Sequence, residues 1–185
     1  DPAQVERLVK TTVDKWGRLD CALNNAGVIG TPFIPTPNYK KETWDQVINV
    51  NLTGVFLSLK YEIPAMLASG GGAIVNMSSI AGQVGGWGGI AYYASKHGVI
   101  GCTKAAALEN ATKGIRVNAV CPAVIKTDMA DQFVPGQEEK FLAAHPIGRF
   151  GETREVADAV LFLCSDRASF MTGIAMPVDG GLLAR

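Results

Sequence analysis

The sequence has 185 residues, of which 48% are hydrophobic and 18% are charged, so it holds enough apolar material for the core of one domain. Lysine plus arginine and aspartate plus glutamate both number 17, and the formal net charge is zero. This balance gives no electrostatic case for binding nucleic acid or an anionic membrane. The longest apolar runs fall far short of the roughly 20 residues that a membrane-spanning helix needs.

The first predicted element is a helix. Asp1 can cap its N-terminus, Pro2 suits its first turn and Gly17 can end it. A short buried strand, "LDCALNNAG" at residues 19–27, follows and ends in a polar turn that contains glycine.

A proline-rich loop then leads into a long helix, which is predicted over residues 41–67 and which Pro64 bends or ends. Further strands are predicted in "GGAIVNMSS", "GIRVNAVCPA" and "GIAMPVDGG". Further helices are predicted at residues 91–112 and in "ETREVADAVLFLCSD". Residues 122–150 are expected to be irregular, with short helical pieces.

Short apolar strands that alternate with long helices predict one α/β domain over residues 1–185, with a parallel sheet and helices on both faces. In open parallel sheets the ligand site lies beyond the carboxyl ends of the strands. The polar or irregular clusters predicted at those ends are Asn24–Asn25, Ser78–Ser79 and Cys121–Pro122–Ala123.

The cysteines and histidines give no metal-binding pattern. Four cysteines each lie in an apolar segment, without a C-x-x-C pair, at Cys21, Cys102, Cys121 and Cys164. We expect buried free thiols of a reducing cytoplasm rather than disulfides or a zinc site. His97 and His145 are far apart in the sequence, so no metal site is expected.

The stretch "GIAYYASKHG" contains a candidate acid–base pair. On a helix, Tyr92 and Lys96 lie one turn apart on the same face. An ammonium beside a phenol favours the phenolate and lowers its pKa, so that the phenol can exchange a proton with an alcohol or carbonyl oxygen. Ordinary packing on a helix surface also explains this spacing. Tyr93 and His97 have the same spacing of four positions.

Two further polar positions could join that pair. Ser78 and Ser79 lie at a strand end, where a hydroxyl could bond the same oxygen. Asn51 projects into an apolar stripe of its predicted helix. Its buried amide needs partners, either a neighbouring backbone carbonyl, or an ordered water on a proton path, or both.

Several segments occur in an order that is specific to one family: "LNNAG", "NVNLTGVF", "IVNMSSIAG", "AYYASKHGV", "IRVNAVCPA-x-I-x-T" and "GIAMPVDGG". Over essentially its whole length the chain resembles the short-chain dehydrogenase/reductase (SDR) family. The resemblance implies a Rossmann-like doubly wound sheet and an oxidoreductase that interconverts an alcohol and a carbonyl with NAD or NADP.

The resemblance also implies roles for individual residues. Tyr92 would act as the acid or base and Ser79 would bind the substrate oxygen. Lys96 would lower the pKa of the tyrosine and bond the nicotinamide ribose, and Asn51 would position a water in a proton relay. Tyr93 would be a packing or lining neighbour of Tyr92.

Besides Tyr92 and Lys96, the cofactor would contact two further segments of this chain. The turn at residues 24–27, with Asn24, Ala26 and Gly27, would support the central sheet and pass close to the adenosine half. Residues in and after the predicted strand segment "GIRVNAVCPA" would border the nicotinamide, namely Pro122, Ile125 and Thr127. Residues 128–150 would correspond to the variable substrate loop.

The chain departs from the family pattern in two places. Ala123 stands where the family usually has glycine. The glycine-rich turn that cradles the pyrophosphate at a helix N-terminus is not in the sequence. We expect that an N-terminal βαβ portion of roughly 60 residues is missing, that the chain is the C-terminal three-quarters of an SDR-type domain, and that "LDCALNN" becomes an exposed edge strand.

Several alternatives stay open from the sequence. The chain could belong to epimerase or dehydratase relatives, or be a truncated or inactive scaffold that keeps the fold. The substrate could be a small cyclic or hydrophobic alcohol, a sugar or a 3-oxoacyl thioester, in a pocket made apolar by aromatic rings. These rings are Phe33, Trp87, Tyr93, Phe133 and Phe141. The resemblance implies a homo-oligomer, a tetramer or dimer, that packs the helices around residues 41–67 and 92–112.

Overall fold

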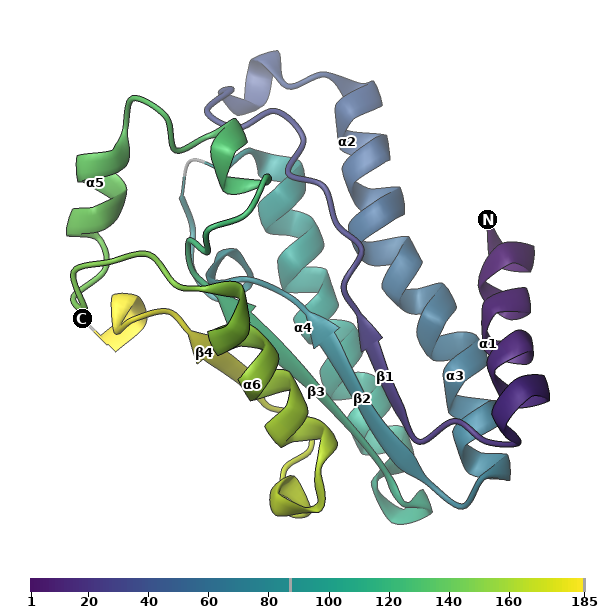
Figure 1. Ribbon diagram of the computed structural model, residues 1–185. Coiled ribbons are helices and arrows are strands. Elements are labelled where there is room, and N and C mark those ends of the chain that lie inside the picture. Colours follow the sequence, from purple (N-terminus) through teal and green to yellow (C-terminus); the bar gives the residue numbers. More distant parts are fainter. Residues whose placement is uncertain (87, 185) are drawn as a thin grey trace.

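The computed structural model of the protein describes residues 1–86 and 88–184. These residues form a four-stranded sheet in the order β1-β2-β3-β4, with every neighbouring pair parallel (Figure 1). The strands are β1 (Cys21–Asn24), β2 (Gly72–Met77), β3 (Ile115–Pro122) and β4 (Ala175–Val178). The predicted parallel sheet is therefore confirmed, and the carboxyl ends of its strands lie at one end of the sheet.

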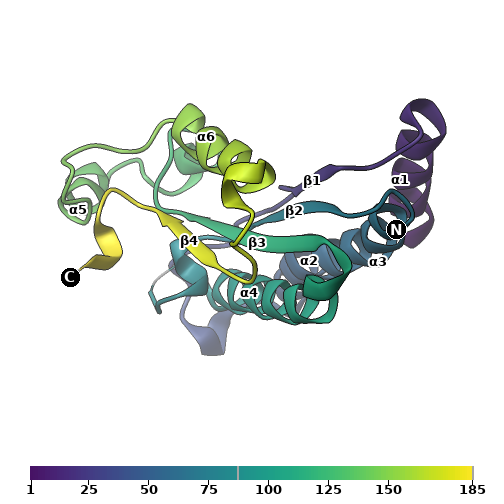
Figure 2. The same cartoon turned by 90° about the horizontal axis from the view of Figure 1, so that it is seen from below.

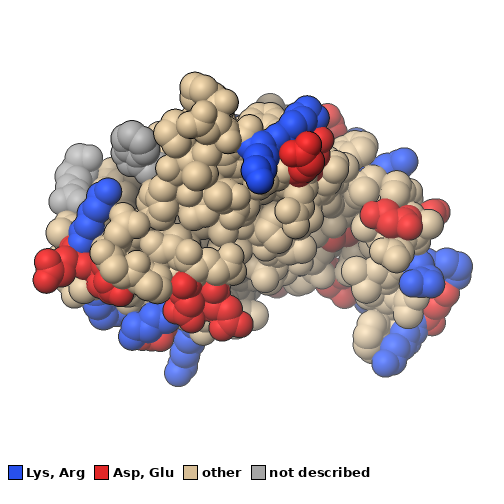
Figure 3. All heavy atoms as spheres, turned by 90° about the horizontal axis from the view of Figure 1, so that it is seen from above, with Lys and Arg blue, Asp and Glu red and all other residues tan. Residues whose placement is uncertain are grey.

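Helices cover both faces of the sheet, as predicted. The α-helices of the described residues are α1 (Pro2–Trp16), α2 (Lys41–Ile48), α3 (Gly54–Ala68), α4 (Ile90–Asn110), α5 (Glu138–Ala143) and α6 (Thr153–Cys164). Figure 2 shows α3 and α4 beneath one face and α6 against the other, with α1 beside α3 near the β1 edge. On the face of the molecule in Figure 3, positive and negative side chains lie interspersed.

The capping signals in the sequence mark the helix ends. The Asp1 carboxylate accepts the Ala3 N–H at 2.9 Å, and Gly17, in a left-handed conformation with φ of 78°, ends α1. At the start of α6, Glu152 and Glu155 form a capping box, in which each side chain accepts the backbone N–H of the other residue. Two orphan donors of the helix terminus are satisfied in this way.

The long helix predicted over residues 41–67 is divided by a π-helical turn at Asn49–Thr53, between α2 and α3. A π turn takes in one more residue than an α-helical turn and so shifts the phase of the side chains that follow. Pro64 lies inside α3, which continues to Ala68, so the proline does not end the helix.

The core lies on both sides of the sheet. Because successive strand residues point to opposite faces, Ile74 of β2 packs in a cluster with Val99 of α4, while Val75 packs on the other face with Leu163 of α6. All four side chains have no measurable exposure. The helices on the two faces are thereby fixed to the central strands.

Strand β1 is the exposed edge that the sequence predicts. It pairs with β2 on one side, and Leu23 keeps 47% of its surface accessible. Cys21 is also exposed, so the expectation that every cysteine is buried is wrong for this residue, because its side chain stands on the open edge strand. Cys121 is buried, and all four cysteines are free thiols.

Among the helices that the structure describes, none combines the length and the apolar character that crossing a bilayer requires.

Candidate active site

The predicted polar residues meet where β2 and β3 end. Ser78 and Ser79 directly follow β2, and the Ser78 N–H still donates to the Val120 carbonyl at 2.9 Å. Helix α4 begins at Ile90 and packs against β3 and the turn after β2. The first turns of α4 therefore lie beside the carboxyl end of the sheet.

Ser79 is held by the backbone on both sides of this corner. Its Oγ accepts the Ala81 N–H at 3.1 Å, which caps a 3-10 turn at Ile80–Gly82. The same hydroxyl donates to the carbonyl of Pro122, at the end of β3, at 3.4 Å. Ser79 is 9% exposed, so its hydroxyl is both oriented and largely shielded from water.

Tyr92 lies against Ser79. Burial raises the pKa of the Tyr92 phenol, and its hydrogen bond with the Ser79 side chain partly offsets this rise. Loss of water sets the direction of this shift, and the lowering of this pKa by Lys96 stays a prediction. The Lys96 Nζ lies 5.5 Å from the centre of the Tyr92 ring, on the helix face that the spacing predicts.

Lys96 is 4% exposed, and its Nζ donates to the Met77 carbonyl at 2.8 Å. Burial lowers the pKa of this ammonium to about 8, although the nearby Cys121 thiol raises it slightly. The Lys96 backbone carbonyl accepts the Ser78 hydroxyl at 2.9 Å. Hydrogen bonds of both the side chain and the backbone of Lys96 thus join helix α4 to the end of strand β2.

Asn51 lies in the π turn and is 1% exposed. Its Oδ1 accepts the Val28 N–H at 2.8 Å, and its Nδ2 donates to the Val28 carbonyl at 2.9 Å and to Ser95 Oγ at 3.1 Å. Ser95 in turn donates to the Tyr92 carbonyl at 2.8 Å. The expected bond to a backbone carbonyl is present, and it links the turn after β1 to the helix that carries Tyr92.

Tyr93 points to a different place from Tyr92. Its hydroxyl contacts Gly86 so closely that a Cβ there would collide with it. Burial raises the pKa of the Tyr93 phenol, and a hydrogen bond with the Gly88 backbone partly offsets this rise. His97 contacts the Tyr93 carbonyl through Nδ1 at 3.0 Å. Tyr93 therefore packs against the glycine-rich loop before α4.

The residues of the turn after β1 that are predicted to contact the cofactor lie in different surroundings. Asn24 faces the helices of one side, where its Nδ2 donates to Asn76 Oδ1 at 2.9 Å and to Glu62 Oε2 at 3.1 Å. Ala26 is exposed. A Cβ on Gly27 would lie 3.5 Å from Asn51 Oδ1 and 3.6 Å from Lys96 Nζ. Gly27 thus passes directly over the buried polar corner.

The three residues predicted to border a nicotinamide lie at the end of β3, in the case of Pro122, and on the loop that follows it. The Pro122 carbonyl accepts from Ser79, and Thr127 Oγ1 donates to the Ile125 carbonyl at 3.2 Å. Ile125 pairs with Gly151 in an isolated parallel bridge. The structure therefore joins Pro122 directly to the Ser79 corner and holds Ile125 against the segment before α6.

The aromatic residues of the expected substrate loop pack with one another. Phe133 and Phe141 meet edge to face, with ring centres 5.4 Å apart, in a small cluster with Phe150. Trp87, also expected to line the pocket, lies outside the described residues. Among the described residues no group of three or more His, Cys, Asp or Glu side chains could hold a metal ion.

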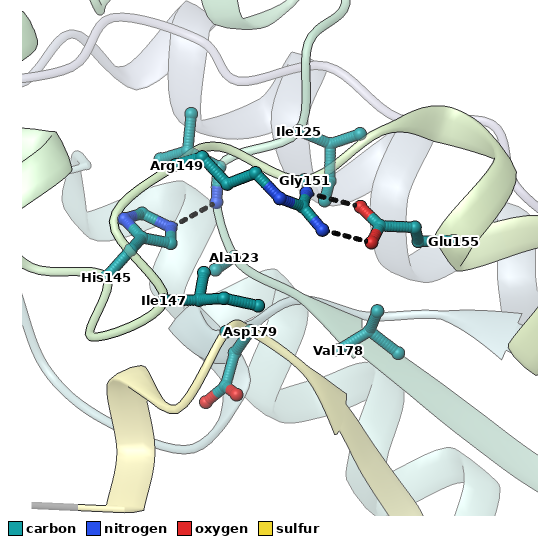
Figure 4. Close-up of a pocket in the computed structure, with 11 residues that line it drawn as sticks. Ala123, Ile125, His145, Ile147, Arg149, Gly151, Glu155, Val178 and Asp179 are labelled. Carbon is teal, nitrogen blue, oxygen red and sulfur yellow. Dashed lines mark hydrogen bonds and ion pairs between the residues drawn. The ribbon is translucent and has the colours of Figure 1, made fainter.

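Sequence patterns did not assign a role to His145, which lines a cavity of about 80 Å³ between the loop after β3 and the end of β4 (Figure 4). The ring is 3% exposed and contacts the backbone through both nitrogens. Because one of these partners is the backbone N–H of Val124, which is 21 residues away in the sequence, no local spacing could have indicated it.

The parallel sheet and the buried Ser79–Tyr92–Lys96 corner at its carboxyl end define a Rossmann-like α/β protein. A family profile described as enoyl-(acyl carrier protein) reductase matches residues 1–183. More particularly, the chain belongs to the short-chain dehydrogenase/reductase family, a family of oxidoreductases.

Characterised relatives share much of the sequence. The cyclohexanol dehydrogenase of Acinetobacter sp. (strain SE19) is 48% identical over 185 residues, which are 100% of this chain and 72% of that relative. The 3-oxoacyl-(acyl-carrier-protein) reductase of Thermotoga maritima is 44% identical over 183 residues, covering 99% of this chain and 74% of the relative.

Solved structures have the same fold. Levodione reductase superposes with a TM-score of 0.94 at 39% identity, over 100% of this chain and 74% of that structure. ElxO with NADP bound superposes with a TM-score of 0.93 at 37% identity, over 100% and 75%.

Proposed function

We propose that the protein is an NAD- or NADP-dependent oxidoreductase that interconverts an alcohol and a carbonyl, with Tyr92 as the acid or base. The observation that carries the proposal is the hydrogen bond of the Tyr92 phenol with the Ser79 side chain in a buried corner, with Lys96 one helical turn away. A substrate oxygen between the two hydroxyls would receive a hydrogen bond from Ser79 and a proton from Tyr92.

The residues present fit the nicotinamide half of such a cofactor. The Lys96 ammonium is buried beside Gly27, where the missing side chain leaves room for close approach. Lys96 would bond the ribose, and Pro122, Ile125 and Thr127 would border the ring. The bound nicotinamide supplies the hydride chemistry, while the chain orients the substrate oxygen and holds the proton that it exchanges.

Asn51 has a positioning role in this proposal. Its bonds to Val28 and Ser95 fix the turn that contains Gly27 relative to the helix turn that carries Tyr92. An ordered water between Asn51 and Lys96 would extend the proton path, as the family resemblance implies.

The glycine-rich turn that holds the pyrophosphate lies, in this proposal, in a segment outside these 185 residues, which make up the C-terminal part of a single family domain. Support comes from the open β1 edge and from the 72% and 74% shares of the two relatives that the chain covers. Calorimetric titration of the 185-residue chain with NAD(H) and NADP(H) tests this. We expect weak binding, and micromolar affinity would contradict it.

We propose the substrate class from the names of the two relatives. A small cyclic secondary alcohol comes first, because the relative at 48% identity is a cyclohexanol dehydrogenase, and a 3-oxoacyl thioester comes second. The test is oxidation of reduced cofactor by cyclohexanone or by a 3-oxoacyl thioester, in the protein with its upstream segment. Lack of turnover with either, despite cofactor binding, would favour the inactive scaffold.

A homo-oligomer, in the form of a tetramer or dimer, belongs to the proposal. Apolar side chains stand exposed on the helices that would pack together, with Phe56 of α3 at 53% and Leu108 of α4 at 84% exposure. Light scattering coupled to size exclusion would measure the mass, and a monomer at all concentrations would contradict this part of the proposal. A cytoplasmic location stays a prediction from the cysteines.

A further inference from the structure

His145 is a buried histidine whose two ring nitrogens bond only to backbone groups in the described contacts. Nδ1 lies 2.7 Å from the Phe141 carbonyl, and Nε2 lies 3.3 Å from the Val124 nitrogen. A carbonyl can only accept and an amide N–H can only donate, so Nδ1 carries the hydrogen and Nε2 accepts. The ring is therefore a neutral imidazole in a single tautomer, and both nitrogens are already in use.

The partner of Nε2 is the backbone N–H of Val124, which lies just beyond the last hydrogen bond between β3 and β4. Strand β3 ends at Pro122, and Ala123 makes the last bond to β4, from its N–H to the Val178 carbonyl at 3.1 Å. Val124 is the next residue and is 9% exposed, so its N–H needs a partner inside the protein. His145 supplies that partner from a segment that precedes α6, as the dashed line in Figure 4 shows.

The segment that carries His145 is itself anchored. Arg149 makes a two-pronged contact with the Glu155 carboxylate of α6, at 2.7 and 2.9 Å (Figure 4). The Ile147 N–H donates to the Gly180 carbonyl, after β4, at 3.1 Å. His145 thus connects Val124 to a segment that α6 and the end of β4 both hold in place.

Other contacts of the loop at residues 122–127 also join it to the segment that carries His145. Gly151 N–H donates to the Val124 carbonyl, and Lys126 N–H donates to the Gly151 carbonyl, both at 3.0 Å. The Ile125 side chain lies over Gly151 so closely that a Cβ there would collide with it. Both backbone groups of Val124 therefore bond to residues 145–151, and the position of Ile125 depends on that match.

We propose that His145 is a positioning residue, whose neutral imidazole sets the loop at residues 122–127 in place by accepting the Val124 N–H. For the cofactor, this role rests on the proposed function, since Ile125 and Thr127 border the nicotinamide only in that proposal. His145 itself touches neither substrate nor cofactor and acts through Val124.

The first test measures the loop alone. Two variants, His145→Phe and His145→Gln, are compared with wild type by amide hydrogen exchange and by nitrogen NMR of the ring. Phenylalanine keeps the ring but not the acceptor, so we expect the Val124 N–H to exchange at least about tenfold faster. Glutamine offers both a carbonyl acceptor and an amide donor, so we expect it to restore much of the protection if the variant keeps the fold.

His97→Phe is the matched control, because His97 Nδ1 makes the same contact with a carbonyl four residues earlier but is exposed on α4. It should leave Val124 exchange unchanged. Unchanged exchange in His145→Phe would overturn the proposal, as would NMR signals that show the hydrogen on Nε2 in the wild type.

The second test uses reduced nicotinamide mononucleotide, which lacks the adenosine half. In the wild-type chain we expect it to shift the amide signals of Ile125 and Thr127, and we expect at least about tenfold weaker binding in His145→Phe, with rescue in His145→Gln. Equal binding by wild type and His145→Phe overturns the role of His145. A wild type in which neither amide responds contradicts the proposed nicotinamide site itself, whatever the exchange data show.

Discussion

At the scale of single residues, burial controls the protonation of the proposed catalytic pair. It raises the pKa of Tyr92 and lowers that of Lys96 to about 8. Both changes favour the neutral form of the group, because water no longer stabilises its charge. At neutral pH the phenol therefore holds its proton, which is the state needed to protonate a carbonyl oxygen during reduction.

The two neighbouring tyrosines give the first prediction. Tyr92→Phe removes the proton donor and should lower kcat by about 10²- to 10⁴-fold, while cofactor affinity stays nearly unchanged. Turnover and cofactor titration in the protein with its upstream segment measure the two effects. Equal losses in both would contradict the proton-transfer role.

Tyr93→Phe is the matched control, because the hydroxyl it removes faces Gly86 and the Gly88 backbone. We expect a mild effect on kcat. A collapse of turnover in this variant would reverse the assignment of the two rings.

The lowered pKa of Lys96 gives a prediction for stability. Between about 8 and 10.5 the unfolded chain binds more protons at this side chain than the folded chain does, so the free energy of unfolding rises with pH across that range. Relative to Lys96→Met, the wild type should gain on the order of 3 kcal/mol from pH 7 to pH 11. Urea unfolding at intervals of pH measures the difference, and parallel pH profiles for the two proteins would contradict it.

The sequence indicated which residues meet in this corner but not the direction of the pKa change. Helical spacing places Tyr92 and Lys96 on one face, and that part of the prediction holds. The sign depends on how much water each group loses, which follows from the packing of α4 against the ends of β2 and β3. That packing involves residues far apart in the chain.

At the scale of elements, predictions were most successful where local signals suffice. Asp1, Gly17 and the Glu152–Glu155 pair mark helix ends through contacts within a few residues. The π turn at Asn49–Thr53 was missed, because its extra residue is stabilised by bonds from Asn51 to the distant Val28 and Ser95. The loop at residues 122–127 was likewise predicted only as irregular, since its partners come from residues 145–151.

The turn between α3 and β2 gives a prediction for adjacent glycines. Gly71 has φ of +125°, and a Cβ there would lie 2.5 Å from the Gly114 carbonyl oxygen. Gly70 has φ of +90°, with nothing within 4 Å of a Cβ. Gly70→Ala should therefore cost only the backbone strain, about 1 kcal/mol, whereas Gly71→Ala should cost about 1–3 kcal/mol more. Chemical unfolding measures both, and equal costs would show that the close approach to Gly114 has no effect.

At the scale of the whole molecule, the parallel sheet and the coverage of both faces followed from the alternation of short apolar strands and long helices. The open β1 edge followed as well, from the expected absence of the strands that cover it in the family. What could not be read from the sequence is how the irregular residues 128–150 fold, because their aromatic cluster forms among side chains without a repeating pattern.

The open edge predicts self-association. Leu23 is 47% exposed on β1, whose outer backbone groups can pair with another chain. Leu23→Lys should lower the fraction of large species at high concentration, as measured by light scattering. Leu8→Lys is the control, since Leu8 is 68% exposed but lies on helix α1. Equal effects of the two changes would show that general surface hydrophobicity, and not the strand edge, drives association.

The π turn between α2 and α3 sets which side of the helix the residues after it face. Val47 and Val55, on either side of the turn, are buried at 0% and 4% exposure. Along a regular α-helix, the eight steps from Val47 to Val55 would turn the second side chain by about 80° from the first, and the wider π turn takes up this difference. Substitutions within Asn49–Thr53 should therefore be tolerated where they keep the wide turn and leave Asn51, which bonds to Val28 and Ser95, in place.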